Sequence, residues 1–297
     1  MPVVRGSKLP TCPICGKSNI TNYSDWSQEI WEVSYCLKEC KACGTVMTFP
    51  IPSDDCISRF YNDCYDFRWF ADHLWAKMRD ARIRIEEYRP FLGERVLDYG
   101  GGFGYFAKAA TEAGFYSTTF DPYLNDHCVE QTAWDAVVAI HVLEHVSNPL
   151  NVLTKVKEFL KPQGHLILAV PNFSSAGYLK LGMQWVWAQP PIAHLYHLTP
   201  AGMAALLQRA GYTVVKMSTC ERWDANSYTD IQARDKYYKF ELQWFSKPFA
   251  KYRWSQKLIA LRNSLLRFWA LRHACADDGA NMTLSELYVI AKITKKE

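Results

Sequence analysis

The chain has 297 residues, a formal net charge of +4 and 49% hydrophobic residues, which suits a catalytic domain with an appendage. A charge this small gives no indication of a nucleic-acid partner. No apolar run reaches the roughly 18 residues of a membrane-spanning helix, and the first ten residues show no apolar signal segment. We therefore expect a cytoplasmic protein. In such a protein, the ten cysteines favour thiols and metal ligands over disulfides.

Two cysteine pairs near the N-terminus share one pattern. Cys12 and Cys15, and likewise Cys40 and Cys43, lie three residues apart and are followed directly by a glycine. The glycine lets the chain fold back, so that backbone N–H groups face the thiolates. Four thiolates at this spacing typically bind one Zn²⁺. The pattern predicts a zinc ribbon over residues 1–57.

Cys36 breaks the symmetry of the two pairs, so we do not expect it to bind zinc. The alternatives for the four paired cysteines are unpaired thiols or redox pairs. A small module of this kind is commonly stabilised by its metal, so its role is structural in the simplest interpretation. The functional alternative is that it packs on the mouth of an active site and shapes the pocket for the substrate.

An aromatic and then helical segment, residues 60–93, leads to the run VLDYGGGFGYF at residues 96–106. A strand ends at Asp98, glycines follow at positions 100, 102 and 104, and a helical pattern begins. Strand, glycine loop and helix are how an open α/β sheet holds a nucleotide-like ligand at the end of its first strand. Glycine allows the tight turn and the close approach of the backbone.

The spacing distinguishes between cofactors. A dinucleotide loop reads G-x-G-x-x-G, whereas here Tyr105 takes the place of the third glycine. The carboxylate of Asp98 would repel phosphates but suits an ammonium group. The pattern D-x-G-x-G-x-G resembles motif I of the class I S-adenosylmethionine (SAM) methyltransferases. The alternative is a glycine-rich turn without a ligand, which would leave this density of glycines without a reason.

The resemblance extends along the chain. Residues 117–123 predict a second strand ending in Asp121, where a carboxylate accepts the ribose hydroxyls; alone, Asp121 would equally suit a turn before proline. In the family, the segment at 60–93 caps the cofactor, which makes Tyr61 and Tyr65 candidates for the methionyl part of SAM or for simple packing. The resemblance implies a cofactor site of Tyr65, Asp98, Gly100, Gly102, Gly104, Asp121, Pro122 and His141.

The next segment, residues 134–172, closely resembles the methyltransferase subgroup whose fourth strand runs into an H-x-L-E-H-V turn. We expect a Rossmann-like α/β fold with helices on both faces of the sheet, following the zinc ribbon, in a methyltransferase domain over 58–297. Between Asp121 and Asp135 there is too little chain for a helix and a third strand, so we expect a truncated sheet edge. The expected elements are a strand at 136–140, a helix at 150–160, a Lys-Pro-Gln-Gly turn, a strand at 165–170, a helix and strand within 194–216, and a last strand at 286–295.

The turn after the fourth strand contains the predicted catalytic residues His141, Glu144 and His145. In sugar methyltransferases that this chain resembles, the matching histidine is the base, and a histidine pKa lies near working pH. Glu144 would orient the imidazole or bind an acceptor hydroxyl. Alternatively, the turn binds a divalent metal, as in related quinone and RNA-end enzymes with Glu-x-x-Glu-His, or Glu144 and His145 only cap it. His194 and His197 are candidates for a second base or for structural roles.

Residues 222–283 form an insert before the last strand, and its segment 247–273 has seven Lys or Arg residues and no acid. Leucines recur there at helical spacing. A basic amphipathic helix suits an anionic membrane surface or a phosphate-bearing acceptor, and it also suits a lid packed on the domain.

The sequence therefore favours a methyltransferase that uses SAM and Zn²⁺ and acts on a hydroxyl or carbon of a small molecule. The arrangement of ribbon and methyltransferase domain resembles enzymes that methylate nucleotide-linked sugars, which makes a sugar acceptor the first expectation. A lipid-linked or quinone-type acceptor at a membrane surface is the alternative. A zinc-ribbon interaction module with a degenerate methyltransferase domain is a third hypothesis, and the intact glycine loop argues against it.

Overall fold

The structure is a computed structural model. It describes residues 11–63, 74–122, 124, 129–182, 185, 187–188, 192–220, 282 and 284–294. The predicted roles of Tyr65 and of the basic segment 247–273 lie outside these residues. Within the described part, no helix combines the length and the apolar character needed to cross a membrane.

Six strands form the larger sheet. They are β4 (Arg95–Tyr99), β5 (Tyr116–Phe120), β6 (Trp134–Ile140), β7 (Leu160–Pro171), β9 (Tyr212–Cys220) and β10 (Glu286–Ile293). Their order in the sheet is β5-β4-β6-β7-β10-β9. The strands β5, β4, β6 and β7 are parallel, whereas β10 runs antiparallel to both β7 and β9.

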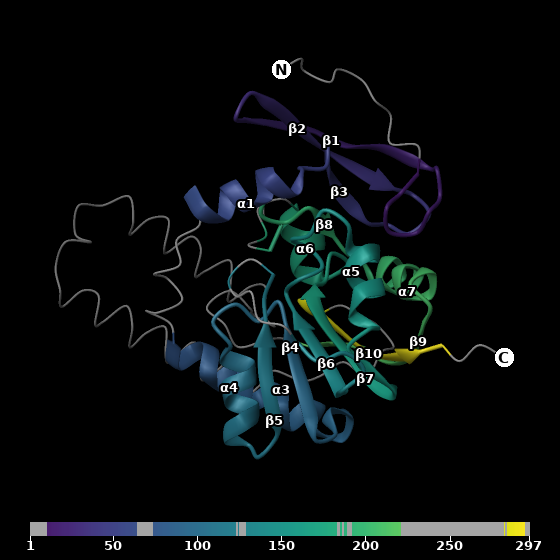
Figure 1. The fold of residues 1–297 in the computed structure, drawn as a ribbon. Helices are drawn as coiled ribbons and strands as arrows, with labels where there is room; N and C mark the ends of the chain where they lie inside the picture. The colour runs from purple at the N-terminus through teal and green to yellow at the C-terminus, as the bar shows by residue number, and fades with distance from the viewer. Residues whose placement is uncertain are drawn as a thin grey trace.

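Helices cover both faces of this sheet (Figure 1). On one face, α3 (Leu74–Leu92) and α4 (Tyr105–Glu112) pack on alternate residues of the strands, for example Val96 and Val138. On the other face, α5 (Pro149–Val156) and α7 (Pro200–Arg209) pack on the intervening residues, such as Leu97 and Val137. Successive residues of a strand point to opposite faces, so strands buried on both sides are apolar throughout. The predicted α/β fold with helices on both faces is confirmed.

A smaller, antiparallel sheet joins the N-terminal region to the larger domain. The strands β1 (Ile20–Ile30), β2 (Val33–Cys40) and β3 (Val46–Phe49) are followed in the sheet by β8 (Tyr196–His197). Figure 1 shows this sheet, α1 (Asp54–Asp63) and α6 (Ala176–Leu181) together at one end of the larger sheet. The predicted boundary at residue 57 falls inside α1, and the division into two domains stays a prediction.

Two details of the predicted elements were wrong. Lys161–Gly164, expected as a turn, belongs to β7, because the pairing with β6 continues past an irregularity beside Trp134. Gly164 supports this close approach, since a Cβ there would lie 3.0 Å from the Trp134 carbonyl oxygen. The helix expected to reach residue 160 ends at Val156. Strand β5 is the outermost strand on its side of the larger sheet among the described residues, and the truncated edge stays a prediction.

Candidate functional site

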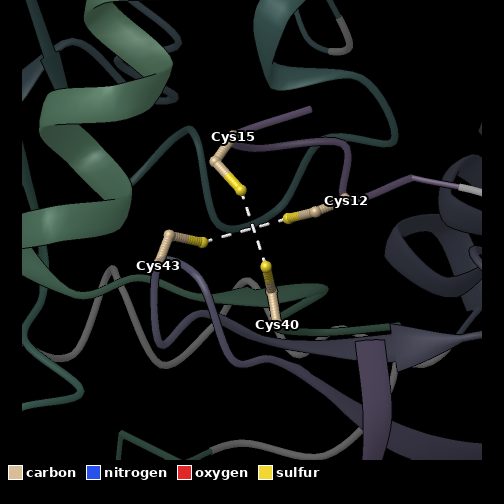
Figure 2. A group of neighbouring side chains, drawn as sticks. All are labelled: Cys12, Cys15, Cys40 and Cys43. Carbon is tan, nitrogen blue, oxygen red and sulfur yellow. Dashed lines mark hydrogen bonds between the residues drawn. The ribbon is translucent and has the colours of Figure 1, made fainter. Parts of the chain in front are cut away.

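The four predicted zinc ligands come together at one point. The sulfur atoms of Cys12, Cys15, Cys40 and Cys43 all lie within 4.8 Å of one another, and Figure 2 shows them converging from two loops. The Cys12–Cys43 and Cys15–Cys40 sulfur distances are 4.0 and 3.5 Å. A tetrahedral Zn²⁺ with Zn–S bonds of about 2.3 Å needs sulfurs about 3.8 Å apart. The donor set therefore fits Zn²⁺, and Cys36 is not part of the group.

The two cysteine loops have the same backbone hydrogen bonds. Cys12 N–H donates to Lys17 O and Gly16 N–H donates to Cys12 O; Cys40 N–H donates to Thr45 O and Gly44 N–H donates to Cys40 O. Gly16 and Gly44 both adopt a left-handed conformation, with φ of +77° and +70°. The repeated glycine after each pair thus makes the fold-back that the sequence predicts.

The cysteine module is packed directly on the larger domain. Arg209 of α7 donates to the carbonyl oxygens of Pro13 and Ile14 at 2.6 and 2.7 Å. Thr199, the N-cap of α7, donates to the carbonyl oxygen of Cys43 at 2.6 Å. Buried Cys12, Cys40 and Cys43 also belong to the same apolar core as α5 and α7. The cysteine module is thus an integral part of the packed structure of the larger domain.

Backbone hydrogen bonds connect this module to the predicted catalytic turn. Thr48 N–H in β3 donates to the carbonyl oxygen of Leu195 at 2.9 Å. Leu195 N–H in turn donates to the carbonyl oxygen of Glu144 at 2.7 Å. The segment 192–198 is thus held between the small sheet and the turn at 141–145. Because this segment carries His194 and His197, the small sheet fixes one side of the candidate site.

The glycines of the β4–α4 loop have different physical reasons. A Cβ at Gly100 would lie 2.6 Å from Val142, one at Gly101 would lie 2.1 Å from the Asp98 carboxylate, and one at Gly104 would lie 2.7 Å from Thr119. At Gly102, the closest atom is Leu124 Cδ1 at 4.0 Å, and φ is +57°. Gly102 is therefore the place where a ligand can approach the backbone of this loop.

Two carboxylates support the loop. Asp121 accepts a hydrogen bond from Gly102 N–H at 2.9 Å and lies at the end of β5. Asp98 is buried, and its Oδ2 accepts from Ala107 N–H of α4 at 3.3 Å and from Thr119 Oγ1 at 3.4 Å. Burial raises the pKa of Asp98 to about 7, although these hydrogen bonds oppose the shift. This geometry favours a supporting role for Asp98, while its contact with a cofactor stays a prediction.

The imidazole of His145 is held in one tautomer. Its Nδ1 lies 2.5 Å from the carbonyl oxygen of Ala193 and 3.0 Å from the hydroxyl of Tyr61 in α1. A carbonyl oxygen can only accept, so Nδ1 carries the proton and Nε2 keeps its lone pair. Burial lowers the pKa of His145, although the nearby negative charge of Glu144 opposes this shift. His145 is therefore neutral near pH 7 and can accept a proton at Nε2.

His141 has a different environment from His145. Its Nδ1 lies 3.0 Å from Glu144 Oε1 and its Nε2 lies 3.2 Å from Glu286 Oε2. Burial lowers its pKa, but the two carboxylates outweigh burial and raise the pKa to about 9. Its ring stacks on Trp187 at 5.4 Å between centroids, and its backbone is left-handed with φ of +54°. The ring is protonated near neutral pH, which is unsuited to a base or a metal ligand.

The group of metal-type ligands in this region is Glu144, His145 and His194, whose ligand atoms lie within 4.8 Å of one another. This set differs from the sequence-based alternative of His141, Glu144 and His145. The rings of His145 and His194 are 4.7 Å apart between centroids. Glu144 Oε2 is buried and has no hydrogen-bond partner among the described residues. One carboxylate oxygen of Glu144 and one nitrogen each of His145 and His194 thus lie close enough together to contact a single bound group.

The structure brings Tyr61, His141, Glu144, His145 and His194 together. Tyr61 contacts His145, which the sequence did not predict. His197 stacks on Phe173, and burial lowers its pKa to about 3, which leaves it neutral. Sequence reasoning missed Glu286 and Arg84, and no spacing signal marks either residue.

Comparisons with known proteins concern mainly the larger domain. Residues 70–217 match the family model described as a methyltransferase domain. The ubiquinone biosynthesis O-methyltransferase of Xylella fastidiosa (strain 9a5c) is 28% identical over 157 residues, which cover 43% of this chain and 64% of that protein. The protein of the same name from Vibrio campbellii is 28% identical over 120 residues, which cover 32% of this chain and 51% of that protein.

The chain thus spans less than two thirds of the length of these curated relatives. Among solved structures, a SAM-dependent methyltransferase from Archaeoglobus fulgidus is similar over 76% of this chain and 100% of its own. Its sequence identity is 18% and the TM-score is 0.45.

Proposed function

The chain carries a methyltransferase domain, and we propose that it transfers the methyl group of SAM to a hydroxyl of a small-molecule acceptor. The observation that carries this proposal is the neutral His145, whose Nδ1 is tied to the Ala193 carbonyl and whose Nε2 is left as a proton acceptor. A hydroxyl must lose its proton as the methyl group transfers, and general bases of this kind typically contribute about 10²- to 10⁴-fold.

The residues around Gly102 fit SAM. The open backbone at Gly102 and the carboxylate of Asp121 would hold the cofactor, with Pro122 beside them. Gly100 and Gly104 fix the shape of the loop, because they allow it to pack closely against Val142 and Thr119. When bound, SAM supplies a methyl group already activated by the sulfonium. The chain's own task is then to orient the acceptor and to remove its proton.

Glu144 complements His145 in this task. Its Oε1 lies 3.8 Å from His145 Nε2, so its charge stabilises the imidazolium that forms as the proton arrives. Its Oε2 is buried and has no hydrogen-bond partner among the described residues. Catalysis thus combines a base with a carboxylate that favours the charged form of the base.

For the acceptor, the weak basicity of His145 favours a phenolic hydroxyl of the quinone-precursor type. A phenol such as tyrosine has a pKa of about 10, whereas an alcohol is closer to water, at about 15.7. The relatives are named ubiquinone biosynthesis O-methyltransferases, which agrees with this choice. A sugar hydroxyl is the second candidate, and the resemblance of the ribbon-plus-methyltransferase arrangement to sugar-nucleotide enzymes supports it.

We further propose that Cys12, Cys15, Cys40 and Cys43 bind one Zn²⁺. Their sulfur spacing supports this. The hydrogen bonds from Thr48 to Leu195 and from Leu195 to Glu144 support a role for the ribbon in orienting the side of the site that would hold the acceptor. Cytoplasmic location and peripheral membrane contact through 247–273 stay predictions; co-sedimentation with phosphatidylglycerol vesicles tests the latter.

The test of the proposed function uses the full chain and SAM labelled in the methyl group. The probes are an ortho-dihydroxybenzoate and a deoxysugar nucleotide, and methylated product is identified by mass spectrometry. We expect SAM binding by calorimetry and methyl transfer to the dihydroxybenzoate. Transfer to the sugar nucleotide alone would select the second candidate. A chain that binds no SAM would overturn the proposed function.

A further inference from the structure

A buried ion pair connects α3 to the start of β10. Arg84 and Glu286 are 2% and 4% exposed. The guanidinium donates to both carboxylate oxygens, from Nη1 to Oε1 at 2.9 Å and from Nη2 to Oε2 at 2.6 Å. Arg84 Nε also donates to Asp80 Oδ2 at 2.6 Å, and Arg84 Nη1 donates to the Tyr88 hydroxyl at 3.2 Å. Both oxygens of Glu286 and both sides of the guanidinium are thereby fixed.

Stability alone does not account for this pair. Removing two charges from water is costly, and a well-packed apolar pair of similar volume is often equally stable or more stable. The surroundings are apolar, since Ile85, Tyr88 and Tyr288 belong to the core between α3 and the sheet. A polar pair at such a place needs another reason.

The second partner of Glu286 supplies one. Glu286 Oε2 lies 3.2 Å from His141 Nε2, and the other ring nitrogen of His141 lies 3.0 Å from Glu144 Oε1. A carboxylate on each side fixes the plane of the ring, which also stacks on Trp187 at an interplanar angle of 2°. The contacts run without a break from Asp80 through Arg84, Glu286 and His141 to Glu144.

We propose that Arg84 and Glu286 are positioning residues for the acceptor side of the site. They hold the ring of His141, and His141 holds the carboxylate of Glu144 beside His145. The strained backbone of His141, with φ of +54°, fits this role, because such conformations persist where the surroundings over-determine them. This inference rests on the proposed function, since it concerns how the methyl-transfer site is oriented.

The experiment separates positioning from stability with an apolar replacement of the pair. The variants are Arg84→Met, Glu286→Leu and the double variant R84M/E286L. Each single variant leaves one buried charge without its partner, so we expect a lower melting temperature. The double variant removes both charges of the pair and should recover part of that loss; the rest remains because Asp80 and His141 each lose one contact. We nevertheless expect its kcat with the ortho-dihydroxybenzoate to stay at least tenfold below wild type, with unchanged SAM affinity. Lys161→Met, which breaks the remote pair with Asp135, is the matched control and should keep kcat.

If the double variant recovers both melting temperature and kcat, the pair is only structural and the inference is overturned. A second readout does not depend on activity. The ¹⁵N–¹H signals of the His141 ring, assigned by their absence from a His141→Gln variant, should be sharp in wild type and broadened or lost in R84M/E286L. Signals that persist unchanged would also overturn the inference. A wild type that binds SAM but methylates neither probe would contradict the proposed function, while the ring signals still test the positioning.

Discussion

The proposed cofactor side of the candidate site is one continuous piece of chain, whereas the proposed acceptor side combines four separate segments. Asp98, Gly102 and Asp121 follow one another through β4, its loop, α4 and β5. On the acceptor side, the turn at 141–145 meets Tyr61 of α1, the segment 192–198 and Glu286 of β10. The small N-terminal sheet holds one of these segments through β3 and β8.

This difference implies that the two sides can be damaged separately. The glycine loop depends on short-range contacts, so a change there should remove cofactor binding and leave the acceptor side in place. The acceptor side depends on the ribbon and on β10, so it should be sensitive to changes far from the reacting atoms. The variants below each perturb one side, and most of them are compared with a measurement on the other.

The largest effect is expected from His145→Ala. Loss of the base should lower kcat by about 10²- to 10⁴-fold, while SAM affinity, measured by calorimetry, stays unchanged because the glycine loop is untouched. His165→Ala, in β7 and packed on Phe91, is the matched histidine control and should keep full activity. A fall in kcat of less than threefold would mean that His145 only caps the turn.

Gly102→Val tests the cofactor side. Valine would put a branched side chain where the loop is open to a ligand, and it would strain a backbone with φ of +57°. We expect calorimetric SAM binding to be lost, with little change in the circular dichroism spectrum. Gly114→Val is the control, since Gly114 has φ of +92° and open space but lies in the turn after α4. Normal SAM binding by Gly102→Val would exclude this loop as the cofactor site.

The strand, glycine loop and helix around Gly102 were predictable from the sequence because the information for them is local. The spacing of Asp98 and the glycines, and the repeated cysteine pairs, each specify a structure within a few residues. The resemblance of these motifs also predicted the Rossmann-like α/β fold with helices on both faces of the sheet. The sequence did not reveal that Gly100, Gly101 and Gly104 fit against Val142, Asp98 and Thr119, which requires the packed fold.

The acceptor side was only partly predictable because its contacts are long-range. His141, Glu144 and His145 stood out as a motif, but Arg84 and Glu286 are 202 residues apart and no periodicity links them. The strand β8 contains only Tyr196 and His197, too short for a pattern, and its partner β3 lies in the ribbon. The raised pKa of His141 likewise depends partly on Glu286, and the tautomer of His145 depends on the carbonyl oxygen of Ala193; both partners come from other segments.

Removal of zinc tests the dependence of the acceptor side on the ribbon. Metal analysis should find about one Zn²⁺ per chain, as four thiolates require. Cys40→Ala should lose the zinc. Its kcat/KM for the acceptor should fall at least about tenfold, because β3 no longer holds the segment 192–198. SAM affinity should change little. Cys36→Ala is the control and should keep its zinc. Full zinc in Cys40→Ala would contradict the assignment of the ligands.

The pH dependence of kcat should report the two histidines of the turn. Burial lowers the pKa of His145, so the base is neutral and activity is full above its ordinary value of 6.5; activity should fall only at lower pH. Carboxylates that outweigh burial raise the pKa of His141 to about 9, so activity should also fall as the pH rises through this value. A plateau between these limits is expected in a profile from pH 5 to 10. If lowering the pH already reduced kcat above pH 6.5, the result would contradict the role of His145 as the base.

The smallest effect is expected from Arg209→Met, which loosens the ribbon without touching its metal ligands. The methionine keeps an apolar stem on α7 but removes the hydrogen bonds to the carbonyl oxygens of Pro13 and Ile14. Since Arg209 is exposed, the loss should be about 1 kcal/mol, which corresponds to a fall in melting temperature of about 2–4 °C. Zinc content should stay at wild-type level, because the thiolates are unchanged.

If the ribbon orients the acceptor side, this variant should also raise the KM for the acceptor by a few fold while SAM affinity stays constant. Arg89→Met, which removes an exposed pair with Glu86 in α3, is the matched control and should change neither quantity. Calorimetry with SAM and steady-state kinetics with the acceptor make the comparison direct. A lower melting temperature with an unchanged KM would show that the docking of the ribbon stabilises the fold without shaping the acceptor side, and the zinc effect would then need a different explanation.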